Sequence, residues 1–256
     1  MSKDYGFVVV HIPHASTLIP DKYRKTILLD DKRLWREMCR MTDAFCDELY
    51  DAPEFTTRVV ASHSRFVCDV ERFRDDNLEP CAKKGQGLMY TRTTLGRRLR
   101  DYDNDLRGTI LSEIYDPHHE RLTTAVEHAL EAYGKCLIID GHSFNARTLV
   151  KPAGFFSRPD FDIGTDDYHT PDGLTQAICE KVRELGYKPK VNTPFSGAIT
   201  PMKYYRNDKR VVSLMFETNR YLYMNEANMT KSENFEATRK ACHDLMYCAA
   251  EYVNSM

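Results

Sequence analysis

The chain alternates between short apolar runs and longer amphipathic stretches. The apolar runs have the length and β-branched content of buried strands, and they lie at residues 7–12, 56–61, 65–70, 135–140 and 210–216. Between them, apolar positions recur at helical spacing at residues 31–50, 96–116, 118–133, 171–186 and 233–253. Strands that alternate with helices predict an α/β protein, a three-layer α/β/α sandwich with a mixed, mostly parallel central sheet.

The 256 residues contain no internal repeat, low-complexity tract or Ser/Gly-rich linker. We therefore expect a single domain over residues 1–256. Two polar segments, 72–94 and 152–170, have the length of functional loops. We expect the first of them to close over a site.

Charge is nearly balanced, with 36 Lys and Arg against 38 Asp and Glu, which predicts no broad attraction to nucleic acid or to a membrane surface. No segment has the roughly 20 apolar residues of a membrane span, and no cleavable signal is recognisable. Eight scattered cysteines without a C-x-x-C pair favour free thiols in a reducing compartment. We expect a cytoplasmic protein, and the sequence does not indicate its oligomeric state.

Two apolar runs are followed by histidine. FVVVHIPHAS places His11 and His14 at the end of the first run, and KCLIIDGHSF places His142 two residues after Asp140. Ligands bind beyond the carboxyl ends of strands in α/β sheets. Two such histidines favour a metal site, with Asp140 orienting a ligand; the alternative is a pair of unrelated core histidines.

Two carboxylates also lie in apolar surroundings. Glu217 ends the run VVSLMFE, so it must pair, bind a cation or have a raised pKa, and each outcome suits a general base. Asp43 lies on the apolar side of the predicted helix over residues 31–50 and also needs a partner. Further along, the arginines of RFVCDVERFRDD either bind an acidic substrate or form surface salt bridges.

The stretch GHSFN permits a rival interpretation, because it is close to the G-x-S-x-G nucleophile elbow with Ser143 as the nucleophile. Asn145 replaces the second glycine. The histidine that follows the nucleophile in the chain would be His169 or His243, and His243 lies in a predicted helix. A serine hydrolase is therefore one alternative hypothesis, the third after the two that are given below.

Seven stretches, in this order, resemble the motif series of the N-formylglutamate amidohydrolase family: HIPHASTLIP, MTDAFCDELYD, SRFVCDVERFRDD, YDPHHERL, IDGHSF, NTPFSGAITP and FETNRYLYM. The resemblance runs from about residue 8 to residue 224. That family resembles zinc carboxypeptidases and aspartoacylase-like deacylases, which implies a mixed eight-stranded sheet between helices.

The resemblance implies roles for particular residues. The zinc ligands, or ligands of another divalent metal, would be His14, Asp43 and His142, with His11 as the alternative to Asp43. Glu217 would be the general base, and His119 would help to stabilise the oxyanion. The substrate would contact Arg72, Arg65, Asp69, Arg220, Asn192 and Gly197.

The implied reaction is hydrolysis of a small acidic N-acyl amino acid, most simply N-formyl-L-glutamate to formate and glutamate. Two departures from the pattern stand out. Thr17 occupies the position of a glutamate ligand, and Glu71 occupies the position of an asparagine. They keep open the second hypothesis, a non-catalytic protein that binds an acidic small molecule or a metal.

Overall fold

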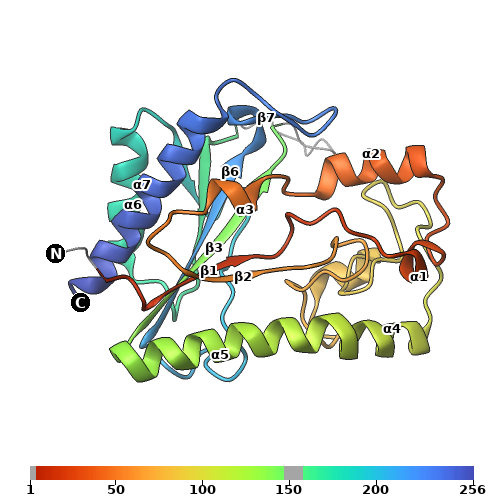
Figure 1. The fold of residues 1–256 in the computed structure, drawn as a ribbon, viewed down its shortest axis with the longest axis horizontal. Helices are drawn as coiled ribbons and strands as arrows, with labels where there is room; N and C mark the ends of the chain where they lie inside the picture. Colours follow the sequence, from red (N-terminus) through yellow and green to blue (C-terminus); the bar gives the residue numbers. More distant parts are fainter. Residues whose placement is uncertain (1–3, 147–157) are drawn as a thin grey trace.

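A six-stranded sheet forms the centre of the protein (Figure 1). The structure is a computed structural model and describes residues 4–146 and 158–256. The strand order is β2-β1-β3-β6-β4-β5. The strands are β1 (Val8–Ile12), β2 (Thr57–Val60), β3 (Cys136–Phe144), β4 (Phe161–Gly164), β5 (Pro189–Val191) and β6 (Val211–Asn219). Within this sheet, as far as the described residues show, only the β4–β6 pairing is antiparallel. The mixed, mostly parallel sheet is confirmed, with six strands in the described residues where the resemblance implied eight.

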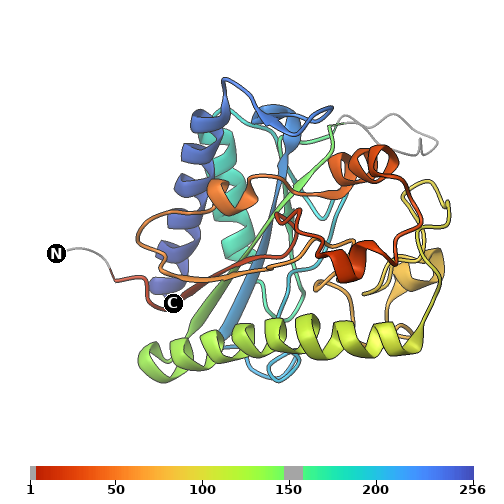
Figure 2. The same ribbon diagram turned by 45° about the vertical axis from the view of Figure 1, so that its right-hand side comes forward.

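Helices cover both faces of the sheet, as predicted (Figures 1 and 2). Successive strand side chains point to opposite faces, so Val9 packs against α5 (Asp116–Tyr133), whereas Val8 and Val10 face the other layer. That second layer consists of α3 (Cys46–Leu49), α6 (Asp172–Glu184) and α7 (Phe235–Asn254).

A group of short elements lies beyond the carboxyl end of β1 (Figure 1). It comprises α1 (Asp21–Arg24), α2 (Asp31–Met41), the 3-10 helix η1 (Pro80–Lys84) and α4 (Asn104–Ile110). The predicted strand over residues 65–70 is wrong, because this segment forms turns here. Its apolar side chains fill two small clusters outside the sheet, one around Phe66 and one around Val67 and Val70.

Several predicted boundaries also change. The helix over residues 31–50 is broken at residues 42–45, and the helix predicted from residue 96 begins at Asn104. From there it continues through a π-helical section, η2 (Leu111–Tyr115), directly into α5. The segment 152–170 contains β4, and its residues 152–157 lie outside the described residues.

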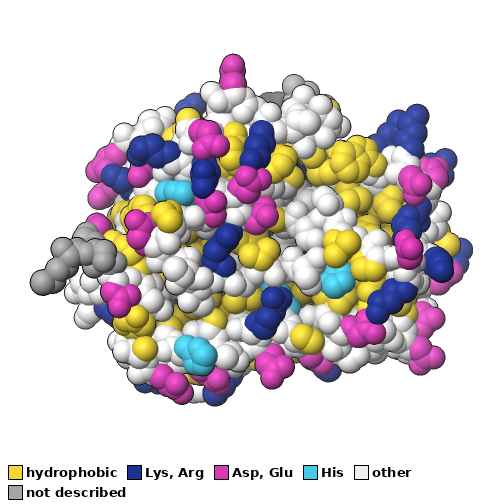
Figure 3. All heavy atoms as spheres, viewed as in Figure 1, with side chains coloured by type: hydrophobic (Ala, Val, Ile, Leu, Met, Phe, Trp, Pro, Cys, Tyr) yellow, Lys and Arg dark blue, Asp and Glu magenta, His cyan; other side chains and the backbone are white. Residues whose placement is uncertain are grey.

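The remaining elements are the 3-10 helix η3 (Arg220–Leu222) and the hairpin strands β7 (Met224–Asn225) and β8 (Thr230–Lys231). None of the helices in the described ranges is long and apolar enough to cross a membrane. All eight cysteines are unpaired, as predicted, and six of them are buried. Cationic and acidic side chains are interspersed over the face drawn in Figure 3.

Candidate active site

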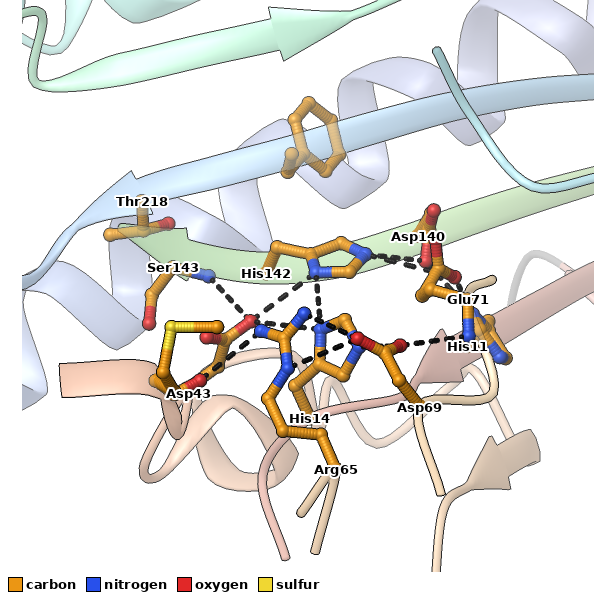
Figure 4. A network of polar contacts seen from close by, with 12 residues as sticks. His11, His14, Asp43, Arg65, Asp69, Glu71, Asp140, His142, Ser143 and Thr218 are labelled. Carbon is orange, nitrogen blue, oxygen red and sulfur yellow. Dashed lines mark hydrogen bonds and ion pairs between the residues drawn. The ribbon is translucent and has the colours of Figure 1, made fainter. Parts of the chain in front are cut away.

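Three side chains that are distant in the sequence converge at the carboxyl edge of the sheet (Figure 4). His14 lies two residues beyond β1, His142 lies in β3, and Asp43 lies in the turn after α2. The two Nδ1 atoms of His14 and His142 are 3.3 Å apart. Asp43 Oδ2 lies 3.2 Å from Nδ1 of His142 and 3.6 Å from Nδ1 of His14. All three side chains are buried.

These distances fit a tetrahedral metal ion. With ligand bonds of about 2.0–2.2 Å, the edges of a tetrahedron around zinc are about 3.3–3.6 Å long. Two imidazoles and one carboxylate are also a ligand set that zinc accepts, and three protein ligands leave a fourth position for water or substrate. The three residues proposed from the sequence therefore suit a divalent metal in chemistry and in spacing.

Asp43 reaches this position because α2 ends before it. Thr42 is extended, and Phe45 adopts a left-handed conformation with φ of 67°, so the chain turns sharply between α2 and α3. The backbone N–H of Asp43 donates to the carbonyl of His14 at 3.0 Å. The expectation that Asp43 lies on a helix is wrong. The turn nevertheless places the Asp43 carboxylate beside the two histidines, where it can replace the glutamate ligand that is absent at Thr17.

Each candidate histidine ligand donates a hydrogen bond from its other ring nitrogen, Nε2, to a buried carboxylate. His142 Nε2 lies 3.0 Å from Asp140 Oδ1, and His14 Nε2 lies 2.8 Å from Asp69 Oδ1. Such carboxylates fix the tautomer of a ligand histidine and leave Nδ1 with a lone pair for the metal. Asp69 was predicted to lie by the substrate; it is fully buried and contacts His14 instead.

Behind Asp140 is a chain of buried histidines. His11 Nδ1 lies 2.8 Å from Asp140 Oδ1, and His11 Nε2 lies 2.8 Å from Nε2 of His118. Because Asp140 accepts from His11, Nε2 of His11 must in turn accept from His118. Burial lowers the pKa of His11 and that of His118, the latter to about 2. His11 therefore supports Asp140, and it does not join His14 and His142.

The resemblance drew attention to His119, but its neighbour His118 is the residue that joins this network. Nε2 of His119 donates to the carbonyl of Val70 at 2.9 Å, and its ring packs on Tyr115. The structure thus places His119 outside the cavity described below. The sequence PHHERL alone does not distinguish the two histidines, because both lie in the first turn of α5.

His11, Glu71 and Asp140 form a second group whose ligand atoms lie close together. His11 Nδ1 is 3.4 Å from Glu71 Oε1, but it is closer to Asp140, to which it already donates. The hydrogen bonds of His11 and Asp140 account for this group without a metal.

Two arginines predicted to hold substrate are engaged within the protein. Arg220 Nη2 lies 2.8 Å from Asp43 Oδ1, and its other nitrogens donate to Ser143 and to the carbonyl of Arg40. Arg65 donates to Asp69 Oδ2 at 2.7 Å and to the carbonyl of Met41. Both guanidinium groups are therefore used to orient carboxylates of the site, Arg220 directly on the candidate ligand Asp43.

A cavity of about 600 Å³ opens beside the three candidate ligands. Arg72 lines it, as do Phe195 and Ser196 of the segment NTPFSGAITP. The two residues predicted from that segment lie elsewhere: the amide of Asn192 bonds Thr165, and Gly197 is not among the lining residues.

The buried carboxyl group of Glu217 and the partly buried one of Glu71 also line this cavity. Burial raises the pKa of Glu217 and that of Glu71 to about 8 each. Glu217 lies on β6 directly opposite His142, and its Oε2 has no hydrogen-bond partner among the described residues. A neutral Glu71 resembles the asparagine amide of the family pattern, so this departure adds no negative charge in the metal-free protein.

Among the described residues, no histidine makes a hydrogen bond to the hydroxyl of Ser143. Its hydroxyl oxygen accepts from Tyr223 at 2.7 Å and from Arg220 at 3.2 Å. His169 bonds the backbone of residues 206 and 211, and His243 bonds Asp51. Neither histidine can act on Ser143 in this arrangement, so the geometry does not support a serine hydrolase.

A ligand set suited to zinc, an unpaired buried glutamate and a cation-lined cavity at the carboxyl edge of an α/β sheet are the components of a metal-assisted hydrolase. Comparison with known families supports an amidohydrolase. The model of the N-formylglutamate amidohydrolase family matches residues 7–224, and the chain belongs to that family.

Individual relatives are distant but cover most of the chain. The N-formylglutamate deformylase of Pseudomonas putida is 26% identical over 229 residues, which span 86% of this chain and 82% of that protein. The crystal structure of N-formylglutamate amidohydrolase from Ralstonia eutropha JMP134 superposes with a TM-score of 0.82 at 23% identity, over 97% of this chain and 94% of the other. A gene product of Agrobacterium tumefaciens gives 0.71 at 21% identity, over 97% and 92%. The two structures support the fold.

Proposed function

We propose that this protein is a zinc-dependent amidohydrolase that cleaves a small N-acyl amino acid, most simply N-formyl-L-glutamate to formate and L-glutamate. The observation that carries the proposal is the convergence of His14, Asp43 and His142 at the edge of a cavity that also contains Glu217. Membership of the N-formylglutamate amidohydrolase family supports the choice of substrate.

A zinc ion held by the three ligands would act as a Lewis acid on the amide carbonyl and would increase the acidity of water in the site. Glu217 would take a proton from the attacking water and deliver it to the nitrogen of the leaving amine. The water oxygen adds to the formyl carbon and the C–N bond breaks, so the products are formate and the free amino acid. A carboxyl group with a pKa of about 8 is suited to take and return a proton near neutral pH.

The protein's own residues would hold the substrate and the ligands in place. Arg72 lines the cavity and would bind a substrate carboxylate. We assign Arg220 to the positioning of Asp43, and Asp69 with Arg65 to the positioning of His14, on the hydrogen bonds described above. Asn192, Gly197 and His119 are given no contact with the substrate.

The test is a screen of formyl-, acetyl- and succinyl-amino acids with the purified protein, combined with elemental analysis. We expect one equivalent of zinc per chain and release of formate from N-formyl-L-glutamate, lost with a chelator and restored by zinc. Bound metal with no turnover of any substrate would identify a binding protein. Turnover that survives the chelator, together with labelling by a fluorophosphonate, would identify a serine hydrolase.

A further inference from the structure

The cavity has more positive charge than one substrate carboxylate requires. Its lining includes six cationic side chains, Arg40, Arg65, Arg72, Lys84, Arg158 and Arg220. Four of them have partners inside the protein: Arg65 and Arg220 as described above, Arg40 on Glu37, and Arg158 on the carbonyl of Asn145. Arg72 and Lys84 remain for an acidic ligand.

Arg72 is only partly neutralised. Its Nε lies 3.3 Å from Asp69 Oδ2, but that carboxyl group also accepts from Arg65 and His14. Lys84 is exposed, and within the described ranges its ammonium group makes neither a hydrogen bond nor an ion pair. These two cations therefore match the two carboxylates of an N-acylated acidic amino acid.

Lys84 is held at the cavity by a well-defined turn. It is the last residue of η1, whose first turn is capped by the side chain of Glu79. Gly85 follows with φ of 74°, a conformation that favours glycine, and its carbonyl accepts from the backbone of residues 91 and 92. Cys81 and Gln86 of the same segment line the cavity, whereas Lys83 does not. The turn thus presents one of two adjacent lysines to the cavity.

We propose that Lys84 is a specificity-determining residue that binds the side-chain carboxylate of the substrate, while Arg72 binds the α-carboxylate. The inference rests on the proposed function and goes beyond it, because it names the group that distinguishes an acidic from a neutral N-acyl amino acid. An ammonium group on a flexible stem suits the distal carboxylate, whose position depends on side-chain length.

The test compares N-formyl-L-glutamate with N-formyl-L-glutamine, which has the same shape without the charge. In K84M we expect kcat/KM for the glutamate substrate to fall roughly 10- to 100-fold, as for loss of a charge-assisted hydrogen bond. The fall should come from a higher KM. K84M should have little effect on kcat/KM for the glutamine substrate. K84R keeps a cation at this position, so it should keep the preference for glutamate over glutamine. K83M is the matched control. An equal loss on both substrates, or the same loss in K83M, would overturn the assignment.

Binding of the products separates this inference from the proposed function. L-Glutamate and L-glutamine are titrated into the zinc-loaded wild type, K84M and K83M by calorimetry. The subsite predicts that the wild type and K83M bind glutamate more tightly than glutamine and that K84M loses the difference, whether or not turnover is detected. If the wild type binds both products equally, the subsite is refuted even in an active enzyme.

Discussion

Asp140 accepts a hydrogen bond from Nε2 of His142 at 3.0 Å, on the side of the ring opposite Nδ1. The same carboxylate accepts from His11, so its direction is fixed from two sides. Burial alone would raise the pKa of Asp140, but the neighbouring His142 and His11 lower it, which keeps the group ionised. The geometry of the candidate metal site therefore depends on a carboxylate outside the three candidate ligands.

Replacing Asp140 with Asn should keep the shape of the site and weaken its hold on zinc. A neutral amide would hold the proton on Nε2 of His142 less strongly than the carboxylate does, so the lone pair on Nδ1 would be less available to the metal. Loss of such a carboxylate partner typically costs 10- to 100-fold in metal affinity. Competition with a chromogenic chelator measures the change. Asp51→Asn is the control, because Asp51 also pairs with a histidine, His243, outside the cavity. Equal zinc affinity in the wild type and Asp140→Asn would contradict the role of Asp140.

Replacing Glu217 with Gln should remove turnover and leave metal content unchanged. Glu217 lines the cavity and is not among the three candidate ligands, so its removal takes away the proton acceptor without disturbing them. General-base catalysis typically contributes 10²- to 10⁴-fold, and we expect kcat to fall by roughly that factor. Stopped and continuous assays of formate release, with zinc analysis of the same samples, provide the measurement. Full activity in this variant would refute the assignment.

Replacing Arg220 with Met distinguishes the two roles considered for this arginine. The family resemblance implied that Arg220 contacts the substrate, whereas the structure pairs it with the buried carboxylate of Asp43. Removing one partner of a buried ion pair typically costs 3–5 kcal/mol, and we expect the free energy of unfolding of the metal-free protein to fall by about that amount. Urea titration measures it, with the exposed Arg206→Met as control. Unchanged stability together with a higher KM would contradict the positioning role and would support contact of Arg220 with the substrate.

The apolar pattern of the sequence was sufficient to place the strands near whose carboxyl ends His14, His142 and Glu217 lie. These three residues follow or end continuous hydrophobic runs, and the runs became adjacent parallel strands because such runs are stable only in the middle of a sheet. The same reasoning failed for residues 65–70, whose apolar side chains are buried against α2 and α4 without joining the sheet.

The remaining features depend on contacts between distant parts of the chain. The turn that places Asp43 interrupts a continuous helical pattern, and it is held by a hydrogen bond to His14. Likewise, His118 meets His11 across 107 residues of sequence. Local spacing contains no information about either contact. β5 is three residues long and not buried, so no hydrophobic pattern marks it.

Replacing Glu71 with Gln tests the neutral state of this carboxyl group. Burial and the nearby Asp140 raise its pKa in the folded protein to about 8. In metal-free protein, both folded and unfolded chains are protonated at Glu71 below the ordinary pKa of 4.5. As pH rises from there towards 8, the unfolded chain ionises while the folded chain retains its proton, so the wild type loses stability.

Glutamine has no such transition. The difference in unfolding free energy between Glu71→Gln and wild type should therefore grow in favour of the variant from pH 5 to pH 8, by at most about 1.4 kcal/mol per pH unit. Urea titrations of chelator-treated protein at several pH values measure the difference, and the exposed Glu233→Gln reports the effect of losing a surface carboxylate. A difference that shrinks as pH rises would mean that Glu71 is ionised and paired with His11, which lies 3.4 Å away.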